Sequence, residues 1–169
     1  MKTTRAQFRV LGIVVTTLAA VVLPTAQAPD RIHGQLTVRG PVRVIEGDTL
    51  EVSINGMRVG VRIPGIKVPR GNTPCGRQAS AAMRELLSSG AILDDEIRLS
   101  PRDNRGLSLL RVTTPGGRPA AAELVAAGLA IADPSNGNAA DFDEIIAAES
   151  NAQTARRGCV WSDDSGVAR

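Results

Sequence analysis

The sequence predicts an α+β fold in which a five-stranded β-barrel carries three helices. Three observations lead to this prediction. Apolar and polar residues alternate between residues 34 and 66, which is typical of half-buried strands. An apolar stripe with helical spacing follows at 75–89. Beyond it, the chain shows two more strand patterns and then two more helical patterns.

The first third of the predicted domain is a β-meander. The segments 36–45, 50–54 and 59–63 all carry apolar residues in a strand-like pattern, and in the last two these alternate with other residues. The dipeptide Asn55-Gly56 between the second and third segments is a signal for a two-residue hairpin. We therefore expect antiparallel strands that have one buried face and one wetter face.

The helices are predicted from apolar spacing and from their end signals. The first begins after Pro74 and ends near Gly90, and its stripe consists of Ala79, Ala82, Met83, Leu86 and Leu87. Strands are expected at 92–99 and 107–112. Pro119 then opens a short helix that reaches Gly128.

The last helix is expected to end at Gly158. Asp141, with Glu144 three residues later, resembles a capping box at its start. Strands that are interrupted by a helix in this order indicate the oligonucleotide/oligosaccharide-binding (OB) type of barrel.

Residues 1–28 have the three parts of a secretory signal peptide. Lys2, Arg5 and Arg9 precede the apolar run 10–23, and small residues precede a cleavage point after Ala28. The run is shorter than the roughly 20 residues of a membrane span. We expect an exported protein with no stable membrane span after cleavage; an uncleaved membrane anchor is the alternative. The predicted mature chain has a flexible start at 29–35, a domain at 36–162 and a loose tail at 163–169.

The charge balance argues against a strongly basic body. The chain has 20 Lys and Arg against 17 Asp and Glu. Beyond residue 28 the two kinds are equal, at 17 each, so the excess of positive charge belongs to the signal segment. With two Phe, one Trp and no Tyr, the composition disfavours a platform that stacks bases on aromatic rings. Two Cys and one His exclude a zinc cluster of the usual spacing.

The two cysteines predict a disulfide. In an exported protein, a pair such as Cys75 and Cys159 is normally bridged. Two buried thiols are the alternative.

Six sequence blocks occur in one order along the chain and resemble the staphylococcal nuclease (thermonuclease) family. The blocks are Val44–Leu50 (VIEGDTL), Val61–Arg70 (VRIPGIKVPR), Gly76–Ala79 (GRQA), Asp103–Leu107 (DNRGL), Leu124–Ala130 (LVAAGLA) and Arg157–Trp161 (RGCVW). The resemblance covers about residues 36–162. It implies a small OB-type barrel with three helices and an ancestral calcium-dependent hydrolysis of DNA and RNA.

The resemblance also implies roles for individual residues. Asp48 stands where the family has a metal ligand, and Arg62 and Arg105 stand at its two catalytic arginines. The family's second metal-binding Asp is replaced by Lys67, and the Glu proposed as its base is replaced by Arg70. At about 4 Å, an ammonium is repelled by a divalent cation by roughly 2 kcal/mol in water and 8 at an effective dielectric of 20. We therefore expect the family's nuclease mechanism to be lost, and no cofactor to be needed.

Three interpretations of this pocket remain. Lys67 can form an ion pair with Asp48 and Glu46 that only stabilises the fold. Alternatively, Arg62, Lys67, Arg70 and Arg105 converge on a positive groove that binds phosphate-containing anions or nucleic acid without cutting them. The third interpretation is a divergent secreted endonuclease that uses Ca²⁺. The sequence favours a binding or interaction module over an enzyme.

Overall fold

The computed structural model describes residues 34–95, 102–136 and 139–161. It contains three α-helices, α1 (Pro74–Leu86), α2 (Ala120–Ala126) and α3 (Phe142–Thr154), and a 3₁₀ turn, η1 (Cys159–Trp161). The strands are β1 (Gly34–Arg39), β2 (Arg43–Glu46), β3 (Thr49–Ile54), β4 (Met57–Arg62), β5 (Ile66–Lys67), β6 (Gly90–Asp95), β7 (Ser108–Leu109), β8 (Arg111–Thr113) and β9 (Ile131–Ala132). The predicted signal peptide and the whole of the predicted loose tail at 163–169 lie outside the described residues.

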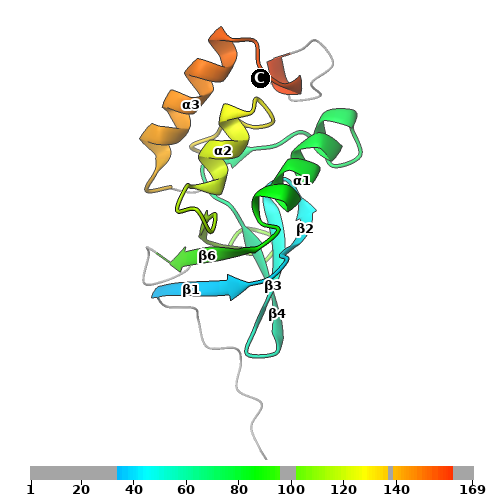
Figure 1. Ribbon diagram of the computed structural model, residues 1–169, viewed down its shortest axis with the longest axis vertical. Helices are drawn as coiled ribbons and strands as arrows, with labels where there is room; N and C mark the ends of the chain where they lie inside the picture. Colours follow the sequence, from blue (N-terminus) through cyan, green and yellow to red (C-terminus); the bar gives the residue numbers. More distant parts are fainter. Residues whose placement is uncertain (1–33, 96–101, 137–138, 162–169) are drawn as a thin grey trace, which may run out of the picture.

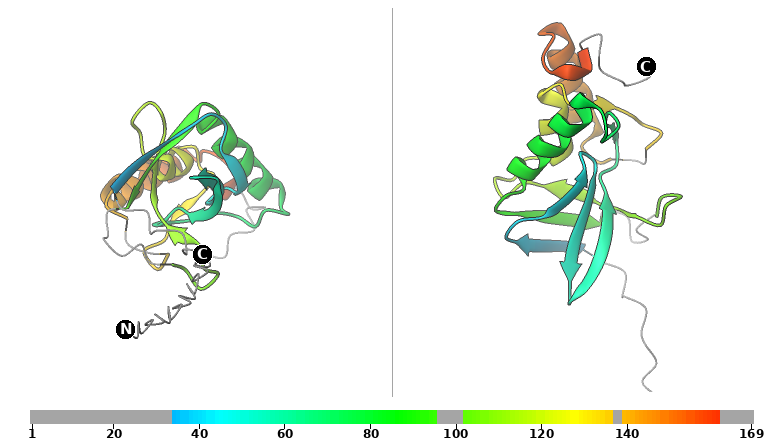
Figure 2. Two further views of the ribbon diagram at one scale, coloured as in Figure 1. Left: turned by 90° about the horizontal axis from the view of Figure 1, so that it is seen from below. Right: turned by 90° about the vertical axis from the view of Figure 1, so that its right-hand side faces the viewer.

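Strands β1 to β4 and β6 lie toward one end of the molecule, and helices α2 and α3 lie at the other end (Figures 1 and 2). The described sheet orders are β1-β6-β8, β2-β3-β4-β7 and β5-β9. The α+β class with three helices is therefore confirmed in the described part of the chain. The exact five-stranded closure stays a prediction.

The first predicted strand is divided in two. Gly40 has φ +83°, a left-handed conformation that favours glycine, and Pro41 follows it. The chain turns there, so that β1 pairs antiparallel with β6 whereas β2 pairs with β3. The predicted hairpin at Asn55-Gly56 is confirmed, since both residues have positive φ between β3 and β4.

Helix α1 packs against strand β2. Thr73 is its N-cap, and the threonine hydroxyl accepts a hydrogen bond from the Gly76 amide at 3.0 Å. Ala79, Met83 and Leu87 of the predicted stripe are fully buried in the core. Gly47 of the β2–β3 turn packs closely against Ala79. The helix therefore holds this turn in place against the core.

Helix α3 begins as predicted, but the expected capping box is wrong. Asp141 is the N-cap residue, yet its side chain makes no capping hydrogen bond. Its Oδ2 instead lies 3.5 Å from Nε of Arg111 on β8. The two atoms form an ion pair without a hydrogen bond, and this pair links α3 to the sheet.

The predicted disulfide is present. Cys75 in the first turn of α1 is bonded to Cys159 in η1 across 84 residues. It connects the start of α1 to the C-terminal end of the described domain. None of the helices among the described residues has the length and apolar character that a membrane span requires.

Candidate functional site

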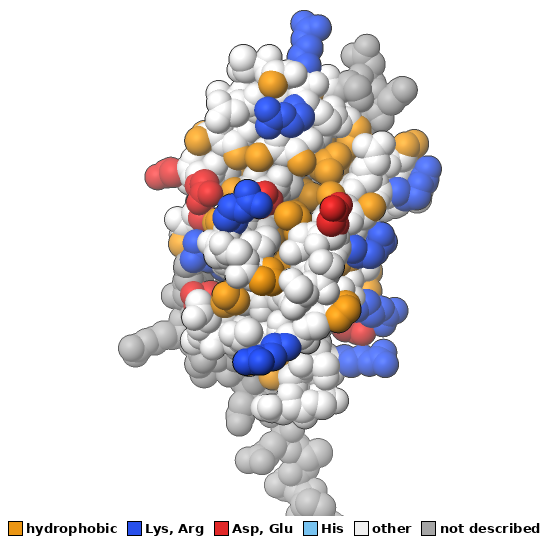
Figure 3. All heavy atoms as spheres, viewed as in Figure 1, with side chains coloured by type: hydrophobic (Ala, Val, Ile, Leu, Met, Phe, Trp, Pro, Cys, Tyr) orange, Lys and Arg blue, Asp and Glu red, His pale blue; other side chains and the backbone are white. Residues whose placement is uncertain are grey.

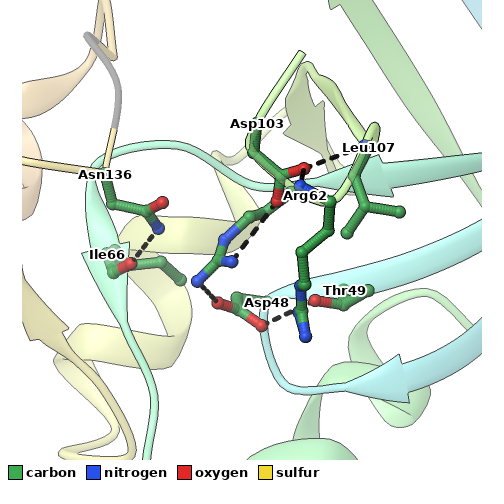
Figure 4. Close-up of polar contacts among 8 residues, drawn as sticks. Asp48, Thr49, Arg62, Ile66, Asp103, Leu107 and Asn136 are labelled. Carbon is green, nitrogen blue, oxygen red and sulfur yellow. Dashed lines mark hydrogen bonds and ion pairs between the residues drawn. The ribbon is translucent and has the colours of Figure 1, made fainter.

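The candidate site is built around Asp48, which lies in the tight turn between β2 and β3. The carboxylate is 2% exposed. Its Oδ1 accepts a hydrogen bond from the Thr49 hydroxyl at 2.9 Å, and its Oδ2 lies 3.0 Å from Nη2 of Arg62 (Figure 4). Thr49 and Arg62 are paired residues of β3 and β4, so the sheet register brings the arginine to the carboxylate.

Arg62 lies between two acids. Its Nη1 is 3.4 Å from Oδ2 of Asp103, which belongs to the loop before β7 (Figure 4). The Arg62 side chain is 23% exposed, and its buried Nε has no hydrogen-bond partner among the described residues. The guanidinium charge is therefore already compensated by the protein. A phosphate at this arginine has to compete with two carboxylates.

Asp103 is fixed by its own loop. Its Oδ1 accepts hydrogen bonds from the backbone amides of Arg105 and Leu107, both at 2.9 Å. Burial alone would raise the pKa of the Asp103 carboxyl. The two amides and the Arg62 guanidinium outweigh this effect, so the pKa lies below its ordinary value of 3.8. Asp103 is therefore ionised at neutral pH and orients Arg62.

Sequence reasoning did not identify Asp103 as a site residue. The signal was present in the run Asp103-Asn104-Arg105-Gly106, because an aspartate that opens a turn commonly binds the amides that follow it. The same loop carries Arg105, whose exposed side chain borders a hollow of about 350 Å³ over the sheet. Glu46 and Thr49 line the same hollow.

Lys67 and Arg70 lie on the next segment of the chain, and both are exposed. Lys67 is on β5, where it pairs with Ile131 of β9. The carbonyl of Arg70 accepts hydrogen bonds from the amide and the hydroxyl of Thr73, so the N-cap of α1 holds the backbone of Arg70 in place. The cation 3.0 Å from Asp48 is Arg62. Arg62 is therefore a cation that pairs with Asp48, whereas the expected ion pair of Lys67 stays a prediction.

The loop that follows β9 forms hydrogen bonds with Gly65 and Ile66, which precede Lys67. The Asn136 side chain donates a hydrogen bond to the carbonyl of Ile66 at 2.6 Å (Figure 4), and the Asn136 carbonyl accepts one from the amide of Gly65. Asp133 donates its amide to the carbonyl of Gly65. These bonds hold the turn that leads into β5.

The side chains at the site do not fit a calcium ion. Calcium in proteins takes six to eight oxygen ligands, of which carboxylates are the usual charged ones. Both carboxylate oxygens of Asp48 already have donors, and positions 67 and 70 carry cations. Within the described ranges, no group of three or more His, Cys, Asp or Glu side chains is placed to hold a metal ion.

Comparison with known proteins agrees with this architecture. The family model described as "Staphylococcal nuclease homologue" matches residues 58–163. The chain is also similar to "Protein ParB" of Escherichia coli, with 30% identity over 154 residues, which is 88% of this chain and 82% of that protein. The family-model match includes Arg62, Lys67, Arg70, Arg105 and both cysteines. Of the candidate site, it leaves out Asp48 and the turn between β2 and β3. The chain belongs to the staphylococcal nuclease homologue family.

Proposed function

We propose that this protein is an exported domain of the nuclease family that no longer cuts nucleic acid with calcium and instead binds phosphate-containing polyanions. One observation carries the proposal. Asp48, the remaining acid of the expected metal site, is ion-paired with Arg62 at 3.0 Å, while Lys67 and Arg70 occupy the other two acidic positions. A divalent cation has neither enough oxygen ligands nor a favourable potential there.

The binding surface that we propose consists of Lys67, Arg70 and Arg105, which are exposed, with Arg62 as a partly shielded fourth cation. Arginine offers a planar fork of donors that matches phosphate oxygens. The signal segment 1–28 supports export, and the disulfide between Cys75 and Cys159 is the kind of bond that an oxidising compartment preserves.

A divergent endonuclease is the second candidate, and Glu46 favours it. This carboxylate is half-buried, lines the same hollow as Arg105 and lies against the loop at Gly71. An acid beside an arginine is the minimum that is needed to position a water molecule against a phosphodiester. In that case Ca²⁺ or another divalent cation would be the cofactor.

A cleavage and binding assay distinguishes the binding domain from the endonuclease. The purified protein is incubated with end-labelled single-stranded DNA or RNA, either with Ca²⁺ or with a chelator. We expect binding without cleavage, and weaker binding by Lys67→Gln/Arg70→Gln. Cleavage that disappears in Asp48→Ala, and also with chelator, would overturn the proposal in favour of the family mechanism. Cleavage that disappears only in Glu46→Gln would establish the divergent endonuclease.

A further inference from the structure

A second groove is lined by residues of strands β1 to β4 and the turns between them. It has a volume of about 480 Å³. It is lined by Val38, Arg39, Pro41, Val42, Arg43, Glu51, Val52, Ser53, Gly56 and Arg58. Figure 3 shows Lys and Arg side chains along the lower right margin of the molecule, beside the position of these strands in Figure 1.

The pleat of the strands brings these polar side chains to one face. In β3 the side chains of Leu50 and Val52 point into the core, so Glu51 and Ser53 point to solvent. The register places Arg43 of β2 opposite Glu51 and Arg58 of β4 opposite Ser53. The two arginines therefore flank one carboxylate.

The charge of the groove is positive. Glu51 Oε1 lies 2.8 Å from Nη1 of Arg43 and 3.7 Å from Nη1 of Arg58. The two arginine side chains are 63% and 76% exposed. A single carboxylate neutralises only one of the two guanidinium groups, and Arg39 adds a third. Most of their N–H donors therefore remain available to an anion.

The groove is continuous with the candidate site. Glu51 lines both this groove and the hollow that Arg105 borders. Gly60 lies opposite Glu51 in the register, and Leu107 from the Arg105 loop packs over this glycine. A ligand that lies over Arg105 can thus reach the groove by passing Glu51.

The shape and chemistry of this surface fit a linked chain of phosphates. The hollow and the groove together follow β3 from Thr49 to Ser53, about 13 Å, which is longer than one phosphate group. Among the described residues, no aromatic side chain lines either the groove or the hollow, so contacts to the backbone of the ligand are favoured over base stacking.

We propose that Arg39, Arg43 and Arg58 form a second contact region for the sugar–phosphate backbone of a nucleic acid that also occupies the candidate site. This inference rests on the proposed function and adds to it the ligand class and its course over the sheet. Binding through this region is independent of base sequence and requires a ligand longer than the candidate site itself.

The test is the salt dependence of binding to long and very short oligonucleotides, in single-stranded and duplex form. For the long oligonucleotide, Arg43→Gln/Arg58→Gln should make the slope of log affinity against log salt less steep by up to about 1.4 for single strands and 1.8 for duplex. A dinucleotide, which only reaches the candidate site, should bind this variant and the wild type equally. Arg39→Gln leaves the ion pairs of Glu51 intact and should reduce the slope by about half as much.

The matched control is Arg84→Gln/Arg156→Gln, which removes two exposed arginines that line neither the groove nor the hollow. If the groove variants match this control while Lys67→Gln/Arg70→Gln weakens binding, the second region is overturned and the proposed function stands. If only the groove variants weaken binding, the groove stands and the candidate site is not used. Binding of heparin but of no oligonucleotide would overturn the nucleic-acid assignment.

Discussion

The guanidinium of Arg62 and the carboxylate of Asp48 form an ion pair in the candidate site, with 3.0 Å between Nη2 and Oδ2. In a calcium site, this carboxylate would face the metal. Here it faces an arginine that a second acid, Asp103, also holds. Arg62 therefore has a structural role, and the exposed cations Lys67, Arg70 and Arg105 are the groups that can bind a ligand.

Asp48→Asn should lower the free energy of unfolding by about 1–3 kcal/mol, because it removes a charge-assisted hydrogen bond at a buried position. Arg62 keeps Asp103, which limits the loss. Urea denaturation measures the change. Glu51→Gln, which weakens an exposed pair, is the control and should cost less than about 1 kcal/mol. Equal losses in the two variants would contradict the central position of the buried pair.

Lys67→Asp/Arg70→Glu should create calcium binding, because it restores two carboxylates and removes two repelling cations. Isothermal titration calorimetry of the folded variant checks this expectation. Arg84→Asp/Arg156→Glu makes the same change of charge elsewhere and should bind no calcium at this site. A variant that folds and yet binds no calcium would show that position 67 is not the missing ligand.

Asp103 should make stability depend on pH at acidic values. Its pKa in the folded protein lies below the ordinary 3.8, so its contribution is fully present above that value and is lost as the pH falls through the lowered pKa. Asp103→Asn should remove this part of the acid dependence of the unfolding free energy. NMR titration of the carboxyl carbon reports the pKa directly. A midpoint at or above 3.8 would be incompatible with the hydrogen bonds from Arg105 and Leu107.

Cys75→Ser/Cys159→Ser should lower the free energy of unfolding by up to about 4–5 kcal/mol, because the bond closes a loop of 84 residues in the unfolded chain. Urea denaturation with and without reductant measures the effect. Wild type in reductant should match the serine variant, and the variant should not respond to reductant. Identical curves for oxidised wild type and the variant would contradict the prediction.

Gly128→Ala should destabilise the domain by more than about 3 kcal/mol. Gly128 has φ +68°, and a Cβ there would overlap the carbonyl of Arg157. Gly56→Ala is the control, since φ is +79° but the space is open, and it should cost about 1–2 kcal/mol. Thermal unfolding distinguishes the two. Similar losses would mean that the contact at Arg157 relaxes easily.

Much of the fold could be predicted from local patterns. The stripe through Ala79 and Met83, the Asn55-Gly56 hairpin and the pairing of the two cysteines are all confirmed. Each depends on periodicity, on local backbone preference or on the number of cysteines, and all of these are visible in the chain. The division of the first strand at Gly40 was missed although the dipeptide Gly40-Pro41 is a turn signal. That its two halves pair with different strands, β6 and β3, shows only in the folded chain.

The sequence by itself determined that the chain carries the cations Lys67 and Arg70 where the resemblance implies two acids. Which cation would neutralise Asp48 was decided by the tertiary structure alone. The register of β3 and β4 brings Arg62 beside it, and the Asp103 loop holds the arginine from the other side. Ion pairs depend on distances of a few ångströms between segments far apart in sequence, and only the folded chain sets those distances.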